Sequence, residues 1–280
     1  MNVATLNFFF CCRYFFLLTV LCNSLVNAVE PAETTLDKLR VLDESTRGEL
    51  GVYVKNLNTG EEIDYRAERK WYLASLLKIP LAIAVLQAVE NKSLSLNDEL
   101  VLQRSDFADG SSGIFADVGS RHSIGDLLKR SLQDNDNTAT NMLLRELGVD
   151  NFNQQTQRNV GADLGPFNTL QPERNHGKNL NTGTLRAMGS LMERLGRGEL
   201  VNTKHTDLLL SHIEDVTSGA KRLNPGTQPN RACNLGITNA RDLSKSVVIV
   251  VCAEGFAELE HAEQSFTSIA TILVADGRTP

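Results

Sequence analysis

Segments with strand-like patterns lie near both ends of this chain, whereas helical patterns fill its middle. Residues 51–54 and 62–65 alternate on either side of an Asn/Gly turn, which predicts a β-hairpin. Two more strand-like runs come much later, at 231–238 and 247–252, followed by a last helical segment at 256–273. A sheet built from both chain ends around inserted helices is typical of an α+β fold. We therefore expect an antiparallel sheet flanked by helices, plus an inserted all-helical subdomain.

Apolar residues recur at helical spacing through the middle of the chain. The strongest pattern covers 75–91, where Pro80 falls in the first turns and is tolerated. Ser123 and Asp136 each precede a helical pattern and are residue types that cap helices. Residues 161–181 have no period and are rich in Gly, Pro and Asn, which predicts a long loop of the kind that usually carries function. The other expected helices are 34–45, 152–160, 184–195 and 203–213.

The first 28 residues have the pattern of a cleavable export signal. Arg13 precedes the apolar run 14–21, and Val26-Asn27-Ala28 supplies a small-residue cleavage pattern. The alternative is an uncleaved membrane anchor, but the run is short for a membrane span and asparagines interrupt its continuation. We expect residues 1–28 to be a signal peptide and the protein to be periplasmic or secreted, with no membrane attachment after cleavage.

Charge and cysteine content exclude some partners. The formal net charge of −6 disfavours nucleic acid, which would favour a basic face. No cluster of cysteine and histidine has zinc spacing, so neither a metal nor a cofactor is expected. We also expect the protein to be a monomer. Three of the five cysteines fall within the predicted signal. The remaining two, Cys233 and Cys252, either pair across adjacent strands in an oxidising compartment or stay as buried free thiols.

Ser75 and Lys78 are the residues that indicate chemistry. They lie three apart at the start of a predicted helix and therefore share one face. A serine hydroxyl needs a base to take its proton, and desolvation in a cleft lowers the pKa of a lysine toward that role. Backbone N–H groups at the helix N-terminus help to bind a developing oxyanion. The spacing alone carries little weight, because the chain repeats it at Ser218 and Lys221.

Four segments in order resemble motifs of the class A β-lactamase and penicillin-binding-protein family. Residues 70–80, KWYLASLLKIP, resemble its nucleophile segment, and residues 135–141, NDNTATN, resemble its S-D-N-T-A-x-N segment. Residues 171–175, QPERN, resemble the E-P-E-x-N of its Ω-loop. Residues 184–200 resemble the following helix and its G-E-L ending. The resemblance implies a β-lactamase-like fold over essentially the whole mature chain.

The resemblance also implies roles for individual residues. Ser75 is the expected nucleophile and Lys78 its base, and Asn137 is expected to orient Lys78 and the substrate amide. The Ser75 backbone N–H and one strand N–H are the expected oxyanion donors. Asn175, in the Ω-loop motif, is a further expected supporting residue.

Two positions depart from the family pattern. Asn135 stands where the family has a serine that relays a proton toward the leaving nitrogen, and an amide cannot relay a proton in that way. Gln171 stands where the family has the glutamate that activates water for deacylation, and glutamine cannot act as a general base. Glu173 substitutes for it only if the register slips by two residues. These departures predict impaired deacylation.

The family's K-T-G strand motif is missing after the P-G-T-like turn at 225–227. Either 231–233 or 234–236 occupies its place, and only the former keeps a cation, Arg231, for a substrate carboxylate. Alternatively, 233–237 matches the next strand and the K-T-G strand is shortened. The sequence leaves these three assignments open.

Together these observations predict a single β-lactamase-like domain over 29–280, with an α/β part at 29–70 and 215–280 and a helical part at 71–214. The predicted function is an exported serine hydrolase that acts through Ser75 acylation on β-lactams or related acyl substrates. A catalytically inactive protein that binds peptidoglycan fragments or a protein partner is the alternative, and a hydrolase of esters or small amides is a third hypothesis.

Overall fold

The computed structural model describes residues 33–108, 117–170, 181–217, 231–239 and 242–279. The predicted signal peptide and the segment 171–175 lie outside these residues. Among the described residues, no helix combines the length and the hydropathy needed to cross a bilayer.

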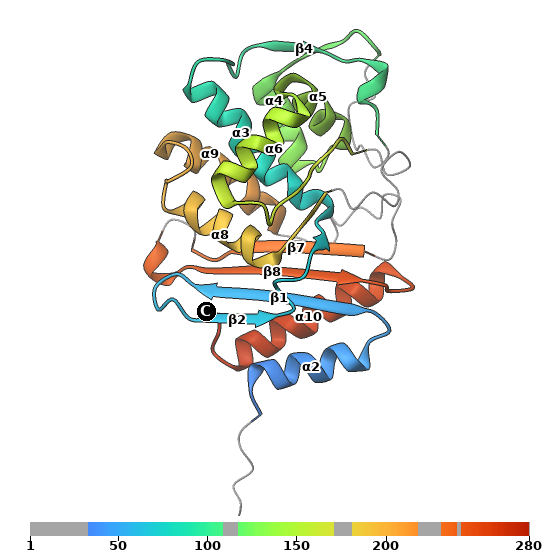
Figure 1. Cartoon of the computed structure of the whole chain (residues 1–280), viewed down its shortest axis with the longest axis vertical. Coiled ribbons are helices and arrows are strands. Elements are labelled where there is room, and N and C mark those ends of the chain that lie inside the picture. The colour runs from blue at the N-terminus through green and yellow to red at the C-terminus, as the bar shows by residue number, and fades with distance from the viewer. Residues whose placement is uncertain (1–32, 109–116, 171–180, 218–230, 240–241, 280) are drawn as a thin grey trace, which may run out of the picture. The chain divides into compact units, whose positions relative to one another are not determined.

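An antiparallel sheet joins the two ends of the chain (Figure 1). Its strand order is β2 (Glu62–Tyr65), β1 (Glu49–Asn56), β8 (Val247–Glu254), β7 (Arg231–Ile237). The first two strands form the predicted hairpin, and β1 pairs with β8 along its whole length. The predicted α+β architecture, with an antiparallel sheet from both chain ends, is therefore confirmed.

Each face of the sheet packs on a different set of helices. On one face, α2 (Thr35–Ser45) and α10 (Leu259–Ala275) bury alternate residues of the central strands, such as Val52 and Val251. On the other face, α8 (Leu185–Gly196) packs against Tyr53 and Val250 (Figure 1). This division follows from the alternation of side chains along a strand.

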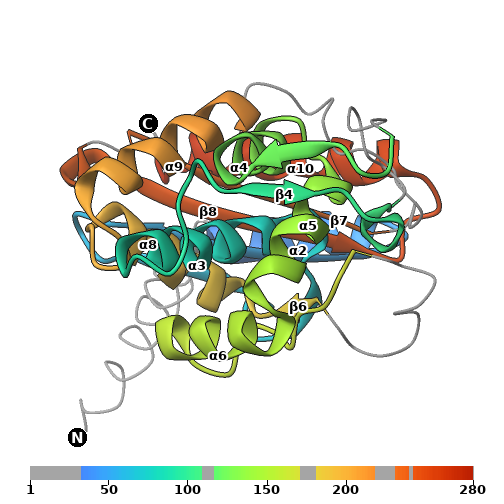
Figure 2. The same cartoon turned by 90° about the horizontal axis from the view of Figure 1, so that it is seen from above.

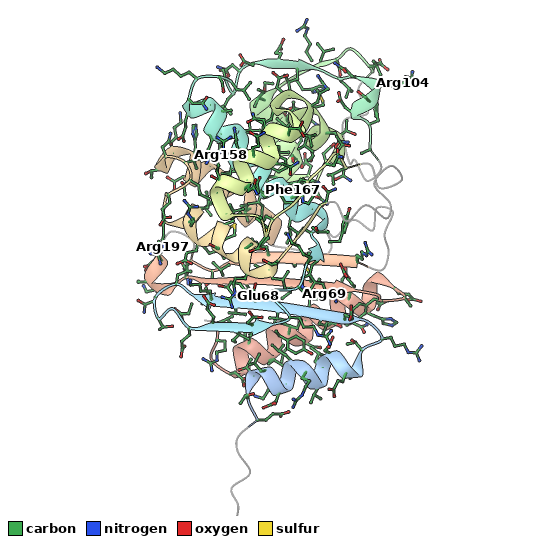
Figure 3. All side chains as sticks on the ribbon, viewed as in Figure 1. Glu68, Arg69, Arg104, Arg158, Phe167 and Arg197 are labelled. Carbon is green, nitrogen blue, oxygen red and sulfur yellow. A yellow bond between two sulfur atoms is a disulfide. The ribbon has the colours of Figure 1, made fainter. Side chains whose placement is uncertain are left out.

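The helices on the second face surround a central apolar helix, α3 (Lys78–Glu90), shown from above in Figure 2. Almost all of its side chains are buried, including Ile83 and Leu86, and each buried leucine or isoleucine contributes about 1.5–3 kcal/mol to stability. The neighbouring helices are α4 (Ile124–Gln133), α5 (Asn137–Leu147), α6 (Val149–Val160) and α9 (Thr203–Thr217). Phe167, which stacks on Phe152 of α6 with ring centroids 5.2 Å apart, lies in this helical layer (Figure 3).

Both predicted helix caps are present. The Ser123 hydroxyl accepts a hydrogen bond from the Asp126 N–H at 3.1 Å, and the Asp136 carboxylate accepts one from the Ala139 N–H at 2.9 Å. A side-chain cap of this kind contributes about 0.5–2 kcal/mol. The Asp136 cap also fixes the approach of the chain to α5, directly beside Lys78.

The turn that carries Ser75 differs from its prediction. The sequence predicts one helix from residue 75, but Ser75 lies in a separate 3₁₀ turn, η1 (Ala74–Leu77), and the α-helix starts at Lys78. Pro80 has no N–H to donate to the Leu76 carbonyl, so the regular helical ladder cannot extend back over this turn. Four short strands were also not predicted, because two or three residues show no period: β3 (Trp71–Tyr72), β4 (Glu99–Val101), β5 (Arg121–Ser123) and β6 (Thr182–Gly183).

Candidate active site

Ser75 is placed by the short strand that precedes it. Trp71 and Tyr72 pair with Gly183 and Thr182 of β6, and the η1 turn follows directly and lies against β7. The Trp71 ring is fully buried and packs against Gly51 of β1. A Cβ at residue 51 would lie 2.5 Å from the ring. Only glycine permits this approach, and it fixes the depth at which the chain enters the turn. The side chain of Ser75 itself is half-buried.

Lys78, at the first position of α3, is 3% exposed and points its ammonium group at the segment before α5. Its Nζ donates to the Asn135 carbonyl oxygen at 2.7 Å, to Asn135 Oδ1 at 2.5 Å and to Asn137 Oδ1 at 2.9 Å. The structure thus brings together three of the predicted site residues. Among the described residues, no hydrogen bond joins Ser75 Oγ to this group.

Burial lowers the pKa of Lys78 to about 7, and the nearby Asp136 carboxylate opposes this shift by favouring the charged form. Desolvation outweighs the attraction because the ammonium loses most of its hydration inside the protein. A lysine with a pKa near 7 has a large neutral fraction at neutral pH, which a general base requires.

The segment before α5 has an unusual backbone that presents these oxygens. Asn135 has a φ of 56°, a left-handed conformation that asparagine and glycine adopt more readily than other residues. Behind it, the Asp136 carbonyl accepts a hydrogen bond from the Thr140 hydroxyl at 2.7 Å, and that hydroxyl in turn contacts Ser131 at 2.8 Å. These buried groups are hydrogen-bonded, and they hold the backbone at Asn135 in place.

Asn141 of α5 binds the long loop immediately before Gln171. Its Oδ1 accepts from the Leu170 N–H at 2.7 Å, and its Nδ2 donates to the Leu170 carbonyl at 3.4 Å and to the Asp106 carbonyl at 3.2 Å. This anchor fixes the point at which the chain departs toward Gln171 and Asn175. Both of those predicted site residues lie outside the described residues.

The other end of the loop is tied down by Asn181, which is buried and has a φ of 57°. Its N–H donates to the Pro166 carbonyl at 2.8 Å, and its Oδ1 accepts from the Asn168 N–H at 2.7 Å. Its own carbonyl accepts from the Leu73 N–H at 2.9 Å, two residues before Ser75. The base of the predicted functional loop is therefore joined directly to the segment that carries Ser75.

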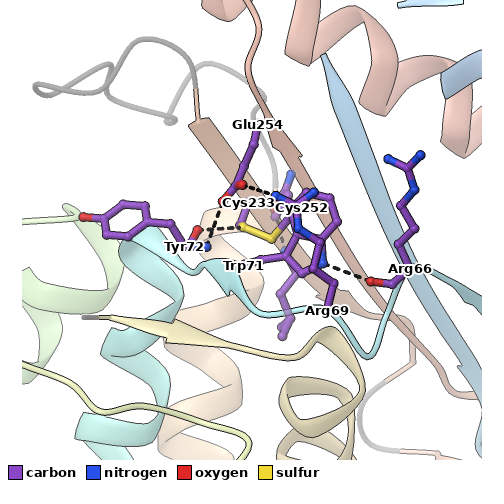
Figure 4. Close-up of a disulfide and its surroundings, with 9 residues drawn as sticks. Arg66, Arg69, Trp71, Tyr72, Cys233, Cys252 and Glu254 are labelled. Carbon is purple, nitrogen blue, oxygen red and sulfur yellow. Dashed lines mark hydrogen bonds and ion pairs between the residues drawn. A yellow bond between two sulfur atoms is a disulfide. The ribbon is translucent and has the colours of Figure 1, made fainter. Parts of the chain in front are cut away.

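On the strand side of Ser75, Glu254 at the end of β8 holds the backbone of Tyr72 (Figure 4). One of its carboxylate oxygens accepts from the Tyr72 N–H at 3.0 Å, and the other accepts from the Arg69 guanidinium at 2.7 Å. Arg69 also stacks over the Trp71 ring at 4.2 Å from its centroid and lies beside the sheet, as labelled in Figure 3.

A disulfide joins Cys233 of β7 to Cys252 of β8, which face each other across the two strands (Figure 4). This pairing is one of the two states that the sequence left open. Cys233 Sγ lies 3.2 Å from the Tyr72 carbonyl oxygen, so the bridge touches the strand that leads into Ser75.

Arg231 is exposed at the first position of β7, with its guanidinium 5.7 Å from the centroid of the Tyr72 ring. It therefore lies on the same side of the site as the disulfide. Both sequence candidates for the K-T-G position, 231–233 and 234–236, belong to this one strand. Which of them corresponds to the motif, or whether β7 is the next strand, stays a prediction.

Sequence reasoning did not find Glu254 and Asn181, and it treated Asn141 only as part of a motif. Glu254 is an unremarkable acidic residue at a strand end, and its role depends on pairing between distant segments. Asn181 was the last residue of an aperiodic loop, where a left-handed asparagine has no distinguishing pattern. Among the described residues, no group of His, Cys, Asp or Glu side chains is arranged to hold a metal ion.

Comparison with known proteins identifies the family. The model of the β-lactamase enzyme family matches residues 32–275. The chain is 29% identical over 181 residues to β-lactamase ROB-1 of Haemophilus influenzae. The aligned region covers 64% of this chain and 59% of that relative's length. A β-lactamase structure from Xanthomonas campestris pv. campestris superposes with a TM-score of 0.75 at 20% identity, over 86% of this chain and 98% of that one. A PBP-A variant superposes with a TM-score of 0.69 at 20% identity, over 88% of this chain and 99% of that one.

This protein belongs to the β-lactamase enzyme family, as the match over residues 32–275 shows. The predicted family resemblance is thereby confirmed. The chain spans less than two thirds of the length of ROB-1. The activity, substrate and site residues of this chain are therefore taken up as proposals below.

Proposed function

We propose that this protein is an exported serine hydrolase whose Ser75 is acylated by β-lactams or related acyl compounds and releases the acyl group slowly. The observation that carries the proposal is the buried Lys78, with its pKa lowered to about 7, at the start of α3 and three residues after Ser75 in the preceding 3₁₀ turn. A relative of the same fold, the PBP-A variant, is described as an acyl-enzyme complex with penicillin G.

In the proposed acylation, neutral Lys78 takes the proton of the Ser75 hydroxyl as its oxygen attacks the lactam carbonyl carbon. The carbonyl oxygen becomes an oxyanion, which the Ser75 backbone N–H helps to bind. The carbon–nitrogen bond of the ring then breaks, and the leaving nitrogen needs a proton. Asn135 cannot relay one, so the Lys78 ammonium is the proposed proton donor.

Deacylation is the proposed slow step. It requires a water molecule whose proton is removed as it attacks the ester of Ser75. Gln171 stands at the family's glutamate position and can bind a water without deprotonating it. Loss of one proton-transfer group typically lowers a rate by about 10²–10⁴, so an acyl-enzyme should accumulate.

Covalent labelling with a fluorescent penicillin tests the nucleophile. Wild-type protein should be labelled and Ser75→Ala should not, whereas Ser218→Ala, in the second Ser-x-x-Lys spacing, should label like the wild type. Absence of labelling of the wild type at millimolar probe would reject acylation by β-lactams. Intact-mass spectrometry should then show an adduct that persists, and the double variant Gln171→Glu/Asn135→Ser should shorten its lifetime.

Export is a separate part of the proposal, supported by the signal-like pattern of residues 1–28. Expression in a Gram-negative host should give a periplasmic protein whose mass corresponds to a start near Val29. A full-length protein retained in the membrane fraction would favour the anchor instead.

The binding-protein alternative is favoured by one observation: all three hydrogens of the Lys78 ammonium are donated to asparagine oxygens. Under this alternative, peptidoglycan fragments should bind equally well to wild type and Ser75→Ala in calorimetric titrations. Cephalosporin turnover that is lost in Ser75→Ala would decide against it.

A further inference from the structure

The oxygens around Lys78 match the hydrogens of an ammonium group one for one. Nζ donates at 2.5–2.9 Å to two oxygens of Asn135 and one of Asn137. A protonated lysine has three N–H groups and uses all of them here. A neutral amine has only two, so one of these oxygens would lose its partner and the nitrogen lone pair would face an acceptor.

Asn135 supplies two of the three oxygens, one from its backbone and one from its side chain. The family serine that it replaces has a hydroxyl, which can donate to a neutral amine as well as accept from an ammonium. The Asn135 amide also has donors on Nδ2, but in the observed orientation it directs Oδ1, which can only accept, at Nζ. The substitution therefore favours one protonation state of its neighbour.

We propose that Asn135 is a positioning residue that favours the protonated form of Lys78, with its three hydrogens directed at the start of α5, and so reduces the fraction of the lysine that is available as a base toward Ser75. The consequence for acylation rests on the proposed function. The effect on the protonation of Lys78 does not.

Several charged groups lie on the elements that pack around α3. Asp136 acts on Lys78 from the cap of α5 and favours its charged form. Arg130 of α4 pairs with Asp126 and also interacts with the charges of Asp134 and Asp136. Further away, Arg145 of α5 pairs with Asp106, His205 of α9 pairs with Glu90 at the far end of α3, and Arg231 of β7 lies over Tyr72. Where α6 meets α3, Asn159 and Gln87 exchange amide hydrogen bonds.

The left-handed backbone at residue 135 determines which variants are informative. Glycine and aspartate both tolerate a φ of 56°, so neither should disturb the backbone carbonyl that also binds Lys78. Asn135→Gly removes the side-chain acceptor, and Asn135→Asp replaces it with a carboxylate. Asn239→Gly, at another left-handed asparagine in the β7–β8 turn, is the matched control.

The experiment is a ¹³C NMR titration of the Lys78 side chain in uniformly lysine-labelled protein, with the signal assigned by its loss in Lys78→Met. The midpoint should fall by about one pH unit in Asn135→Gly, because the ammonium loses a hydrogen-bond acceptor, and should rise in Asn135→Asp. Asn239→Gly should titrate like the wild type. Equal midpoints in wild type, Asn135→Gly and Asn135→Asp would overturn the proposal, as would a shift in the opposite order.

Labelling rates with a fluorescent penicillin, measured from about pH 5.5 to 9.5, connect this result to Ser75. Below the midpoint, Asn135→Gly should be acylated about tenfold faster than the wild type, and Asn135→Asp more slowly. If the NMR midpoints move in the expected order and no variant is labelled, the proposed acylation fails while the role of Asn135 stands. Slower labelling in both variants without ordered midpoints would show that Asn135 is merely structural.

Discussion

The two sides of Ser75 are held by different kinds of interaction. On the helical side, neutral asparagine oxygens surround a lysine that is 3% exposed. On the strand side, a disulfide lies against the Tyr72 carbonyl, and the partly exposed carboxylate of Glu254 accepts a hydrogen bond from the Tyr72 N–H. The first arrangement surrounds an ionisable group, and the second lies against a stretch of backbone. Substitutions on the helical side should therefore change the chemistry most, and those on the strand side should change stability or geometry.

The largest expected effect on the helical side comes from Lys78→Met, which keeps most of the length of the side chain and removes the proposed base. Labelling by a penicillin should fall by about 10²–10⁴. Lys129→Met, at an exposed position on α4, should label normally. Undiminished labelling of Lys78→Met would show that another group takes the Ser75 proton.

The same variant tests the cost of burying the lysine. The folded-state pKa of Lys78 is lowered to about 7 from the ordinary value of 10.5, so the unfolded chain binds more protons between these values. The free energy of unfolding of the wild type should therefore rise as pH increases through that window, whereas below it the full cost of the buried charge applies. Chemical denaturation near pH 6, 8 and 10 should show this rise in wild type and Lys129→Met but not in Lys78→Met. Parallel profiles for all three proteins would contradict the low pKa.

On the strand side, removal of the disulfide should lower stability more than it lowers labelling. The bridge closes a loop with a sequence separation of 19, for which chain-entropy models give about 3 kcal/mol. Cys233→Ala/Cys252→Ala should lose this amount in urea denaturation and keep labelling within about tenfold of the wild type, since neither cysteine contacts the reacting atoms. Reductant should affect the wild type similarly and leave the double variant unchanged. A complete loss of labelling in a folded double variant would place the bridge in the catalytic geometry itself.

Asn141→Leu should show what the anchoring of the long loop contributes, separately from the rest of the site. It leaves the Leu170 N–H and carbonyl without their partner, which costs about 1–3 kcal/mol of stability. Because the anchored segment leads to Gln171, the lifetime of the acyl-enzyme should change more than the rate of its formation. Intact-mass time courses measure both, and the exposed Asn58→Leu is the control.

The smallest effect is expected for Glu254→Gln. The amide oxygen still accepts from the Tyr72 N–H, and only the ion pair with Arg69 is lost. A partly exposed pair of this kind contributes at most about 1 kcal/mol. Thermal denaturation should therefore distinguish Glu254→Ala, which loses both interactions, from Glu254→Gln. Equal destabilisation by the two variants would show that the charge, and not the hydrogen bond, matters.

Patterns within single segments were enough to predict the hairpin, the caps at Ser123 and Asp136 and the main helices. Each of these depends on side chains a few residues apart, which the sequence displays directly. The family-like motifs then implied that Asn137 would orient Lys78, and the two side chains are hydrogen-bonded. The contact of Asn135 with Lys78 was not predicted.

What the sequence did not reveal depends on contacts between distant segments. Nothing near Glu254 indicates that its carboxylate reaches Tyr72, and nothing in the pattern of Cys233 distinguishes a bridge from a free thiol. The 3₁₀ turn at Ser75 depends on Pro80, which has no N–H to donate. Pro80 is visible in the sequence, but the spacing of apolar residues does not distinguish a 3₁₀ turn from the start of an α-helix.

The pairing of β1 with β8 has a consequence for the timing of folding. Glu49 pairs with Glu254, so the central strands of the sheet come from opposite ends of the chain. A ribosome must synthesise almost the entire polypeptide before this pair can form, and the cysteine of β8 emerges equally late. Until then β1 has only β2 beside it, and the sheet cannot be completed, whereas the helices between the two strands have already been synthesised.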